Sequence, residues 1–156
     1  MRQIGILAFV LLVVLSVATQ DTAKVVFVPA KKIESDIRKA PANSIGESEI
    51  DLIERTPTHA GILLRRTAPG KAEVHETEAD VWWVIDGGAV VVTGGSVIGG
   101  AQTEAGEIRG SGISGGEVHQ IAKGDFIRIP AGVPHWLKKI NGEELVYIVV
   151  KYAASK

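Results

Sequence analysis

The stretch 124-GDFIRIPAGVPHWLKK-139 carries the strongest structural signals in the chain. The apolar residues Phe126, Ile127 and Ile129 predict a short strand, and the segment from Pro130 to Pro134 predicts a tight turn after it. His135 then opens a second apolar run, so the stretch predicts a β-hairpin with a histidine at the start of its returning arm. Such a histidine can lie on an inner wall, close to side chains of neighbouring strands.

The stretch 69-PGKAEVHETEADVWWVIDGG-88 supplies side chains that this histidine could meet. Side chains alternate faces along a strand, so residues two apart share a face. Glu73 and His75 have this relation, and Asp80 shares a face with Trp82 in the run that follows. The same alternation places Trp83 on the opposite face.

The downstream stretch resembles the second sequence motif of the cupins. That motif runs Gly, five residues, Pro, one residue, Gly, two residues, His, three residues, Asn. Gly124, Pro130, Gly132 and His135 match it in type and spacing, and Lys139 stands in place of the Asn.

The upstream stretch resembles the first cupin motif in spacing but departs from it in residue type. Counting back from Gly87, Asp80 occupies the position of the Glu and His75 that of the second His. Glu73 replaces the first His, and Thr67 stands where the leading Gly is expected. The first motif is therefore degenerate.

The resemblance implies an all-β, cupin-like (jelly-roll) β-barrel that often holds a divalent metal through three His and one Glu. In this chain the corresponding ligands would be Glu73, His75, Asp80 and His135. Two imidazoles and two carboxylates suit Mn, Fe, Zn or Ni ions. If Glu73 stays unbound, two His and one carboxylate remain, and Glu73 could act as a general base. A metal-free barrel remains an alternative.

Three further residues are candidates for substrate binding. Trp82 shares the inward face and could form a pocket wall or simply fill the core. Arg128 precedes Pro130 by two residues and could reach a bound carboxylate. Arg109 is a candidate anion contact if the segment 94–116, which contains nine glycines, folds over the barrel mouth. A long, weakly patterned segment of this kind is either functional, mobile or an ordered surface excursion.

Three regions are predicted along the chain. Residues 1–18 have a positive Arg2, an apolar run and small residues before a cleavage point after Ala18, as in a secretory signal peptide. Residues 19–48 contain a predicted strand at 24–28 and a short helix at 31–40. Residues 49–153 contain short β segments separated by turn residues, which favour the cupin-like barrel. The predicted strands are 49–55, 60–67, 72–77, 80–86, 89–93, 117–121, 125–130, 135–140 and 144–152.

Composition limits the function classes. The 17 basic and 18 acidic residues give no electrostatic reason to expect nucleic acid as a partner. The chain has no cysteine, which excludes disulfides, thiolate metal sites and cysteine nucleophiles. The apolar run at the N-terminus is too short for a stable membrane anchor, since a spanning helix needs about 20 residues.

The sequence leaves several functions open. The first is an exported, periplasmic or secreted, metal-dependent barrel that acts on or binds a small molecule, with oxygenase or isomerase chemistry if it is an enzyme. The second is a metal-free module that binds a small molecule such as a sugar or carboxylate without turnover. The third is a structural, dimer-forming barrel. A homodimer is compatible with each.

Overall fold

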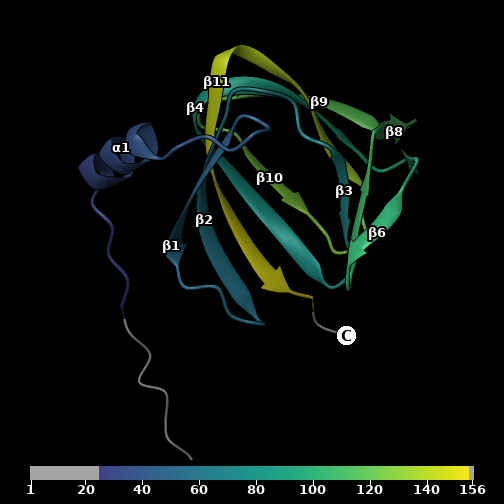
Figure 1. Ribbon diagram of the computed structural model, residues 1–156, viewed down its shortest axis with the longest axis horizontal. Helices are drawn as coiled ribbons and strands as arrows, with labels where there is room; N and C mark the ends of the chain where they lie inside the picture. The colour runs from purple at the N-terminus through teal and green to yellow at the C-terminus, as the bar shows by residue number, and fades with distance from the viewer. Residues whose placement is uncertain (1–24, 155–156) are drawn as a thin grey trace, which may run out of the picture.

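The computed structural model describes residues 25–154 and shows one helix followed by eleven strands (Figure 1). The all-β prediction with a short N-terminal helix is therefore confirmed. The helix α1 spans Ala30–Lys39. The strands are β1 (Glu47–Ile53), β2 (His59–Arg66), β3 (Ala72–His75), β4 (Glu78–Thr93), β5 (Ser96–Ile98), β6 (Ala101–Glu104), β7 (Glu107–Gly110), β8 (Gly112–Ser114), β9 (Glu117–Ala122), β10 (Phe126–Ile129) and β11 (His135–Ala153).

Two long strands, β4 and β11, hold the barrel together. They pair with each other, antiparallel, from His135↔Thr93 to Ala153↔Glu78. The C-terminal half of β11 also pairs with β2, while the N-terminal half of β4 pairs with β10. The N-terminal half of β11 pairs with β3, and the C-terminal half of β4 pairs with β9. Each long strand thus belongs to two walls, and the sheet curls into a barrel between them.

The dipeptides 87-GG-88 and 141-NG-142 do not reverse the chain, although the sequence predicted breaks at both. β4 and β11 run through them, with a register shift between Asn141 and Leu145. Gly87 lies at φ +76°, and a Cβ there would come within 2.1 Å of the Glu144 carbonyl oxygen. The two long strands therefore bend at a bulge, and only glycine fits at its closest approach.

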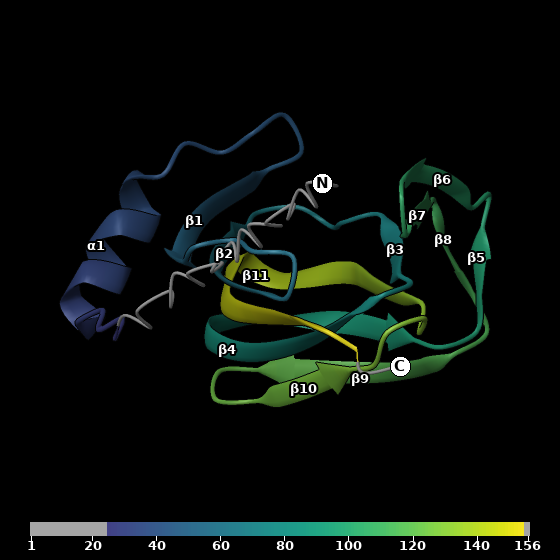
Figure 2. The ribbon, with the colours of Figure 1, turned by 90° about the horizontal axis from the view of Figure 1, so that it is seen from below.

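The barrel interior and the outer face of one wall are both apolar. The interior cluster is built around Trp82, Val84, Leu137, Leu145 and Tyr147. Outside the barrel, Ile37 of α1 packs against Leu63 and Val146, so the helix covers the outer face of β2 and β11. Figure 2 shows α1 at the opposite end of the molecule from β5 to β8.

The N-terminal region agrees with the sequence in its helix but not in its strand. The predicted helix at 31–40 is confirmed as Ala30–Lys39. The predicted strand at 24–28 is wrong, because residues 25–29 form no ladder. Val25 and Phe27 are exposed, and the segment pairs with no strand in the described part of the chain.

The glycine-rich segment is ordered and extends the barrel. β7 pairs with β3, from Ala72↔Gly110 to His75↔Glu107, and β6 pairs with β7. β5 and β8 form a separate two-stranded sheet. The segment therefore adds two strands beside β3 and brings its own polar side chains to the barrel wall.

The predicted signal peptide at 1–18 lies outside the described residues. Between residues 25 and 154, no helix has the length and apolar character needed to cross a membrane.

Candidate metal centre

His75 ends β3 with its side chain buried inside the barrel. Its Nδ1 lies 2.6 Å from Oε1 and 2.8 Å from Oε2 of Glu107, which faces it across the β3–β7 pair. Because an ionised carboxylate only accepts hydrogen bonds, Nδ1 is the donor. The Nε2 lone pair of His75 is thereby left free to bind a cation, in the carboxylate–histidine arrangement that orients metal ligands.

His135 opens β11 and is also buried. Its Nδ1 donates to the carbonyl oxygen of Val133 at 3.2 Å, because a carbonyl can only accept. Its Nε2 is buried and has no hydrogen-bond partner among the described residues. Burial lowers the pKa of His135, so the imidazole is neutral at pH 7 and its Nε2 lone pair is unoccupied.

The two imidazoles face a common point together with two carboxylates. Nε2 of His75 lies 3.6 Å from Oε2 of Glu73 and 3.6 Å from Oδ2 of Asp80. Nε2 of His135 lies 3.8 Å from the same Asp80 oxygen. Ligand atoms that share one ion at roughly 2.0–2.2 Å lie roughly 3–4 Å apart, so the donors present fit a divalent metal.

Both carboxylates approach the imidazoles and could supply a ligand oxygen. One ligand atom each of Glu73, His75 and His135 lies within 4.8 Å of the others. Asp80 approaches both imidazoles but is held by Lys151 Nζ on Oδ1 at 2.8 Å. Burial by itself would raise the pKa of Asp80, but the charges of Lys151 and His75 outweigh it and lower that pKa. Glu73, His75 and His135 form one donor set, and Asp80 Oδ2 adds a fourth donor within 3.8 Å of both imidazole Nε2 atoms.

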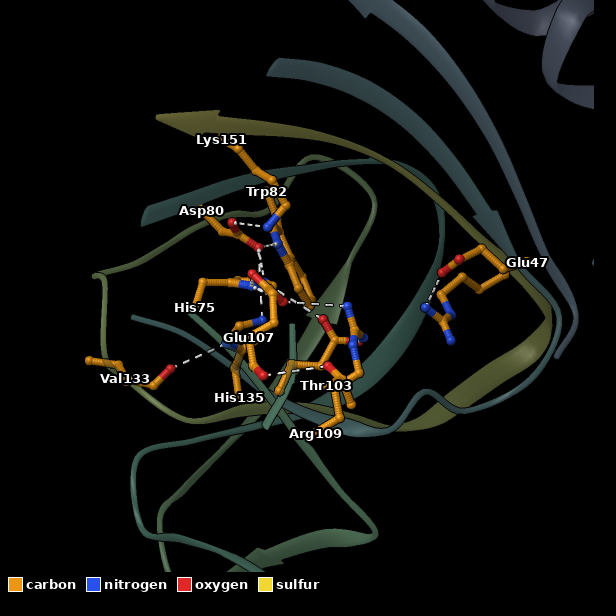
Figure 3. Close-up of polar contacts among 12 residues, drawn as sticks. Glu47, His75, Asp80, Trp82, Thr103, Glu107, Arg109, Val133, His135 and Lys151 are labelled. Atoms are coloured by element: carbon orange, nitrogen blue, oxygen red, sulfur yellow. Dashed lines mark hydrogen bonds and ion pairs between the residues drawn. The ribbon is translucent and has the colours of Figure 1, made fainter. Parts of the chain in front are cut away.

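Cations hold both carboxylates in the same way. Lys151 binds Oδ1 of Asp80, and Arg109 binds Oε1 of Glu73. In each case the second oxygen, Oδ2 or Oε2, is the one that faces His75. The arrangement fixes one oxygen of each carboxylate and leaves the other directed at the point that the imidazoles share. Figure 3 shows Asp80 between Lys151 and His75.

The cavity next to these residues has a volume of about 150 Å³. Trp82 lines it, and the Trp82 ring meets the His135 ring edge-on at a centroid distance of 5.8 Å. Trp82 Nε1 donates to Asp80 Oδ2 at 3.2 Å. Trp82 is therefore both a wall of the cavity and a support for one carboxylate.

The two predicted arginine contacts lie in different places. Arg109 lines the cavity, but the segment that carries it extends the sheet beside β3 instead of folding over the barrel mouth. Arg128 is outside: its Nε donates to the Tyr152 hydroxyl at 2.7 Å on the exposed face. The prediction that Arg128 contacts a substrate in the barrel is therefore wrong. Ile127 and Ile129 take the inward positions of β10 and pack in the core.

Sequence reasoning missed Glu107 and Lys151, which hold His75 and Asp80 in place. Glu107 and Arg109 are two apart in the short strand 107-EIRG-110. That spacing is the signal that could have indicated two polar groups on one face. Lys151 shares the inward face of β11 with Tyr147 and Val149, as all three line the cavity.

Replacing Glu107 tests the orientation of His75. Glu107→Gln keeps the shape but exchanges a charged acceptor for a neutral one, which holds the Nδ1–H of His75 less strongly. We expect divalent-metal affinity to fall by about 10- to 100-fold, as is typical when the outer partner of a ligating histidine is changed. Competition with a metal-sensitive dye measures this, with Glu104→Gln, an exposed carboxylate of β6, as the matched control. Equal affinity in wild type and Glu107→Gln would rule out an orienting role.

Comparisons with known proteins bear on the fold. No protein-family model matches the sequence, and no curated protein matches it significantly. Among solved structures, KdgF from Halomonas sp. is 14% identical with a TM-score of 0.53, over 74% of this chain and 88% of that chain. A putative mannose-6-phosphate isomerase from Ralstonia eutropha JMP134 is 16% identical with a TM-score of 0.52, over 74% and 92%.

A third similar structure is itself described as a cupin domain. The cupin domain of Cnp3 from Schizosaccharomyces pombe is 11% identical with a TM-score of 0.51. The match covers 69% of this chain and 65% of that chain, so this protein spans about two thirds of the Cnp3 domain.

The fold and the site together define an antiparallel barrel with histidines and carboxylates gathered in its interior. This barrel is the cupin fold, which confirms the resemblance drawn from the two sequence motifs.

Proposed function

We propose that the chain is an exported cupin-like protein that binds one divalent metal in its barrel and binds or acts on a small molecule there. The buried Nε2 of His135, which has no partner among residues 25–154, is the observation that carries the proposal. An unsatisfied buried nitrogen costs about 1–3 kcal/mol, and a metal ion removes this cost. His75 presents its own Nε2 to the same point.

The candidate ligands are His75, His135 and Glu73, with Asp80 as the fourth. A bound Mn, Fe, Zn or Ni ion would act as a Lewis acid toward an oxygen of the ligand. Glu107 and Val133 orient the imidazoles, and Trp82 lines the cavity and donates to Asp80. If Glu73 remains unbound, its free oxygen is placed to accept a proton from a ligand beside His75.

Metal content tests the proposal directly. The protein would be purified without a polyhistidine tag and analysed by elemental mass spectrometry, before and after incubation with Mn²⁺, Fe²⁺, Zn²⁺ or Ni²⁺. We expect about one ion per chain in the best case. Iron or manganese would direct the search toward oxygenase or isomerase reactions. Protein that takes up none of the four ions would exclude the metal-binding function.

A metal-free binding module is the second candidate, and one observation favours it. Lys151 and Arg109 already neutralise Asp80 and Glu73, so the site is less negative than its carboxylates alone would make it. Ligand binding that survives removal of metal by a chelator would support this function.

The proposed export rests on residues 1–18, which resemble a secretory signal peptide. The mass of the mature protein tests it: cleavage after Ala18 leaves a chain that begins at Thr19. A mass that retains residues 1–18 would argue against cleavage.

A homodimer is also proposed, on the outer face of the barrel. Phe126 faces Trp83 across β10 and β4, and Trp83 faces Ile148 across β4 and β11. Trp83 and Phe126 are 54% and 66% exposed, and this apolar row continues the cluster that α1 covers. A second copy of the chain would bury the exposed side chains of Trp83 and Phe126.

Replacing the exposed aromatic residue tests the dimer. Trp83→Lys should shift the protein to a monomer at concentrations where the wild type dimerises, because it places a charge in the buried interface. Sedimentation velocity measures the shift, and Val118→Lys, an exposed residue on β9, is the matched control. A wild-type protein that stays monomeric at high concentration would exclude the dimer.

A further inference from the structure

A second polar group lies in the same cavity, on the wall opposite the candidate metal centre. Arg66 ends β2, and its side chain is 7% exposed. It pairs with Glu47 through Nη1, while its Nε is buried without a hydrogen-bond partner among the described residues. Figure 3 shows Glu47 across the barrel interior from His75 and His135. The cavity lining includes both groups.

The orientation of Arg66 follows from strand alternation. Ile62, Leu64 and Arg66 line the cavity, while Leu63 packs outside beneath α1. Arg65, the next residue, points outward and donates to the Ala40 carbonyl and the Ser48 hydroxyl. Arg65 Nε also lacks a hydrogen-bond partner among the described residues, but its side chain is 20% exposed against 7% for Arg66, and only Arg66 lines the cavity.

Gly70 and Tyr147 determine where the guanidinium of Arg66 lies. A Cβ on Gly70 would come within 3.0 Å of Arg66 Nη2, so the guanidinium packs against a backbone that has no side chain. Tyr147 is buried on the inner face of β11 and lines the same cavity. Arg66 is therefore held at a fixed place with a donor left over.

With a metal bound, the charges of the cavity favour an anion. Four ion pairs among the lining residues cancel: Arg55 with Glu49, Arg66 with Glu47, Arg109 with Glu73, and Lys151 with Asp80. Lys71 also lines the cavity and is left without a carboxylate from this set, but Glu107, beside His75 and Arg109, offsets its charge, so the positive excess comes from a bound metal. A divalent ion would add two positive charges. A low-dielectric cavity with this excess of positive charge attracts small anions.

We propose that the cavity binds a small dicarboxylate, with one carboxylate at the histidine cluster and the other at Arg66. The inference rests on the proposed metal binding for the first carboxylate and on Arg66 for the second. A planar guanidinium matches a carboxylate, and its hydrogen bonds to an ionised partner are stronger than neutral ones. The cavity volume of about 150 Å³ suits a small molecule and not a polymer.

Calorimetric titration of the metal-loaded full chain tests the inference. The probes are malonate, succinate and glutarate, with propionate as the single-carboxylate comparison. We expect one of the dicarboxylates to bind at least about tenfold more tightly than propionate, because only a dianion reaches both ends. Equal affinity for all four probes would overturn the inference.

Variants assign the second carboxylate to Arg66. Arg66→Gln should weaken binding of the best dicarboxylate by about 10- to 100-fold and leave propionate unchanged, since propionate uses only the histidine end. Arg65→Gln is the matched control on the outward face of the same strand and should change neither affinity. An Arg66→Gln protein that keeps wild-type affinity would also overturn the inference.

A second variant, expected to bind the dicarboxylate more tightly, tests the inference even if Arg66→Gln misfolds. Glu47→Gln removes the carboxylate that competes for Arg66, so the dicarboxylate should bind more tightly, by at least about threefold. Unchanged or weaker binding would count against the inference. Absence of metal would end both proposals, whereas metal uptake without preference for a dicarboxylate would end only this one.

Discussion

Replacing either buried histidine, in His75→Ala or His135→Ala, is expected to abolish stable metal uptake. Each variant removes one of the two nitrogens that face the shared point, and no other histidine lies within reach in the described part of the chain. Loss of one imidazole should lower the affinity by more than about 100-fold, which exceeds the effect of changing an outer partner. Elemental mass spectrometry after dialysis measures the loss.

The other two histidines provide matched controls. His119 donates or accepts in a hydrogen bond of 2.8 Å with the Thr93 hydroxyl, and His59 interacts with Thr56 and Thr58 on the exposed surface. His119→Ala and His59→Ala should therefore keep about one metal ion per chain. Metal that persists in His75→Ala and His135→Ala, with the fold intact by circular dichroism, would place the metal elsewhere.

Gly87→Ala is expected to destabilise the barrel strongly. The backbone at Gly87 lies in the left-handed region, which costs a side-chain-bearing residue about 1–2 kcal/mol. The new Cβ would also meet the Glu144 carbonyl oxygen at 2.1 Å, and displacing that backbone costs about 1–3 kcal/mol more. We expect the free energy of unfolding to fall by about 2–5 kcal/mol, measured by urea denaturation.

Gly142→Ala separates the two causes. Gly142 has φ +96°, but a Cβ there would meet nothing within 4 Å. Its loss of stability should therefore reflect backbone strain alone, about 1–2 kcal/mol. If both alanine variants lost the same stability, the contact with Glu144 would contribute nothing and the bulge would be more adaptable than its geometry indicates.

The barrel could be predicted because its signals are local. The Pro130–Pro134 turn and the alternation around Trp82 both depend on residues close in sequence, and the structure has the turn and the predicted faces. The continuity of β4 and β11 could not be predicted. Gly87 and Gly142 resemble turn residues, and only the pairing of two distant strands converts such positions into bends within a strand.

The site was predictable only where its residues fall on predicted strands. Glu73, His75, Asp80 and His135 do come together, because each lies on an inward position of its strand. Glu107 comes from a segment without hydrophobic periodicity, so nothing local linked it to His75. Arg128 was misplaced because its distance from Pro130 does not determine which face of β10 points inward, and that face belongs to Ile127 and Ile129.

The order of the strands along the chain has a consequence for folding. β11 lies at residues 135–153, and it pairs with β2, β3 and β4, all of which precede it in sequence. A nascent chain that has not yet emerged past residue 153 lacks the strand around which the barrel closes. Most native contacts therefore join residues far apart in sequence, and proteins with such high contact order fold slowly. During synthesis the edges of β2 and β4 that β11 covers in the folded barrel stay unpaired, so a chaperone has time to bind them before the barrel forms.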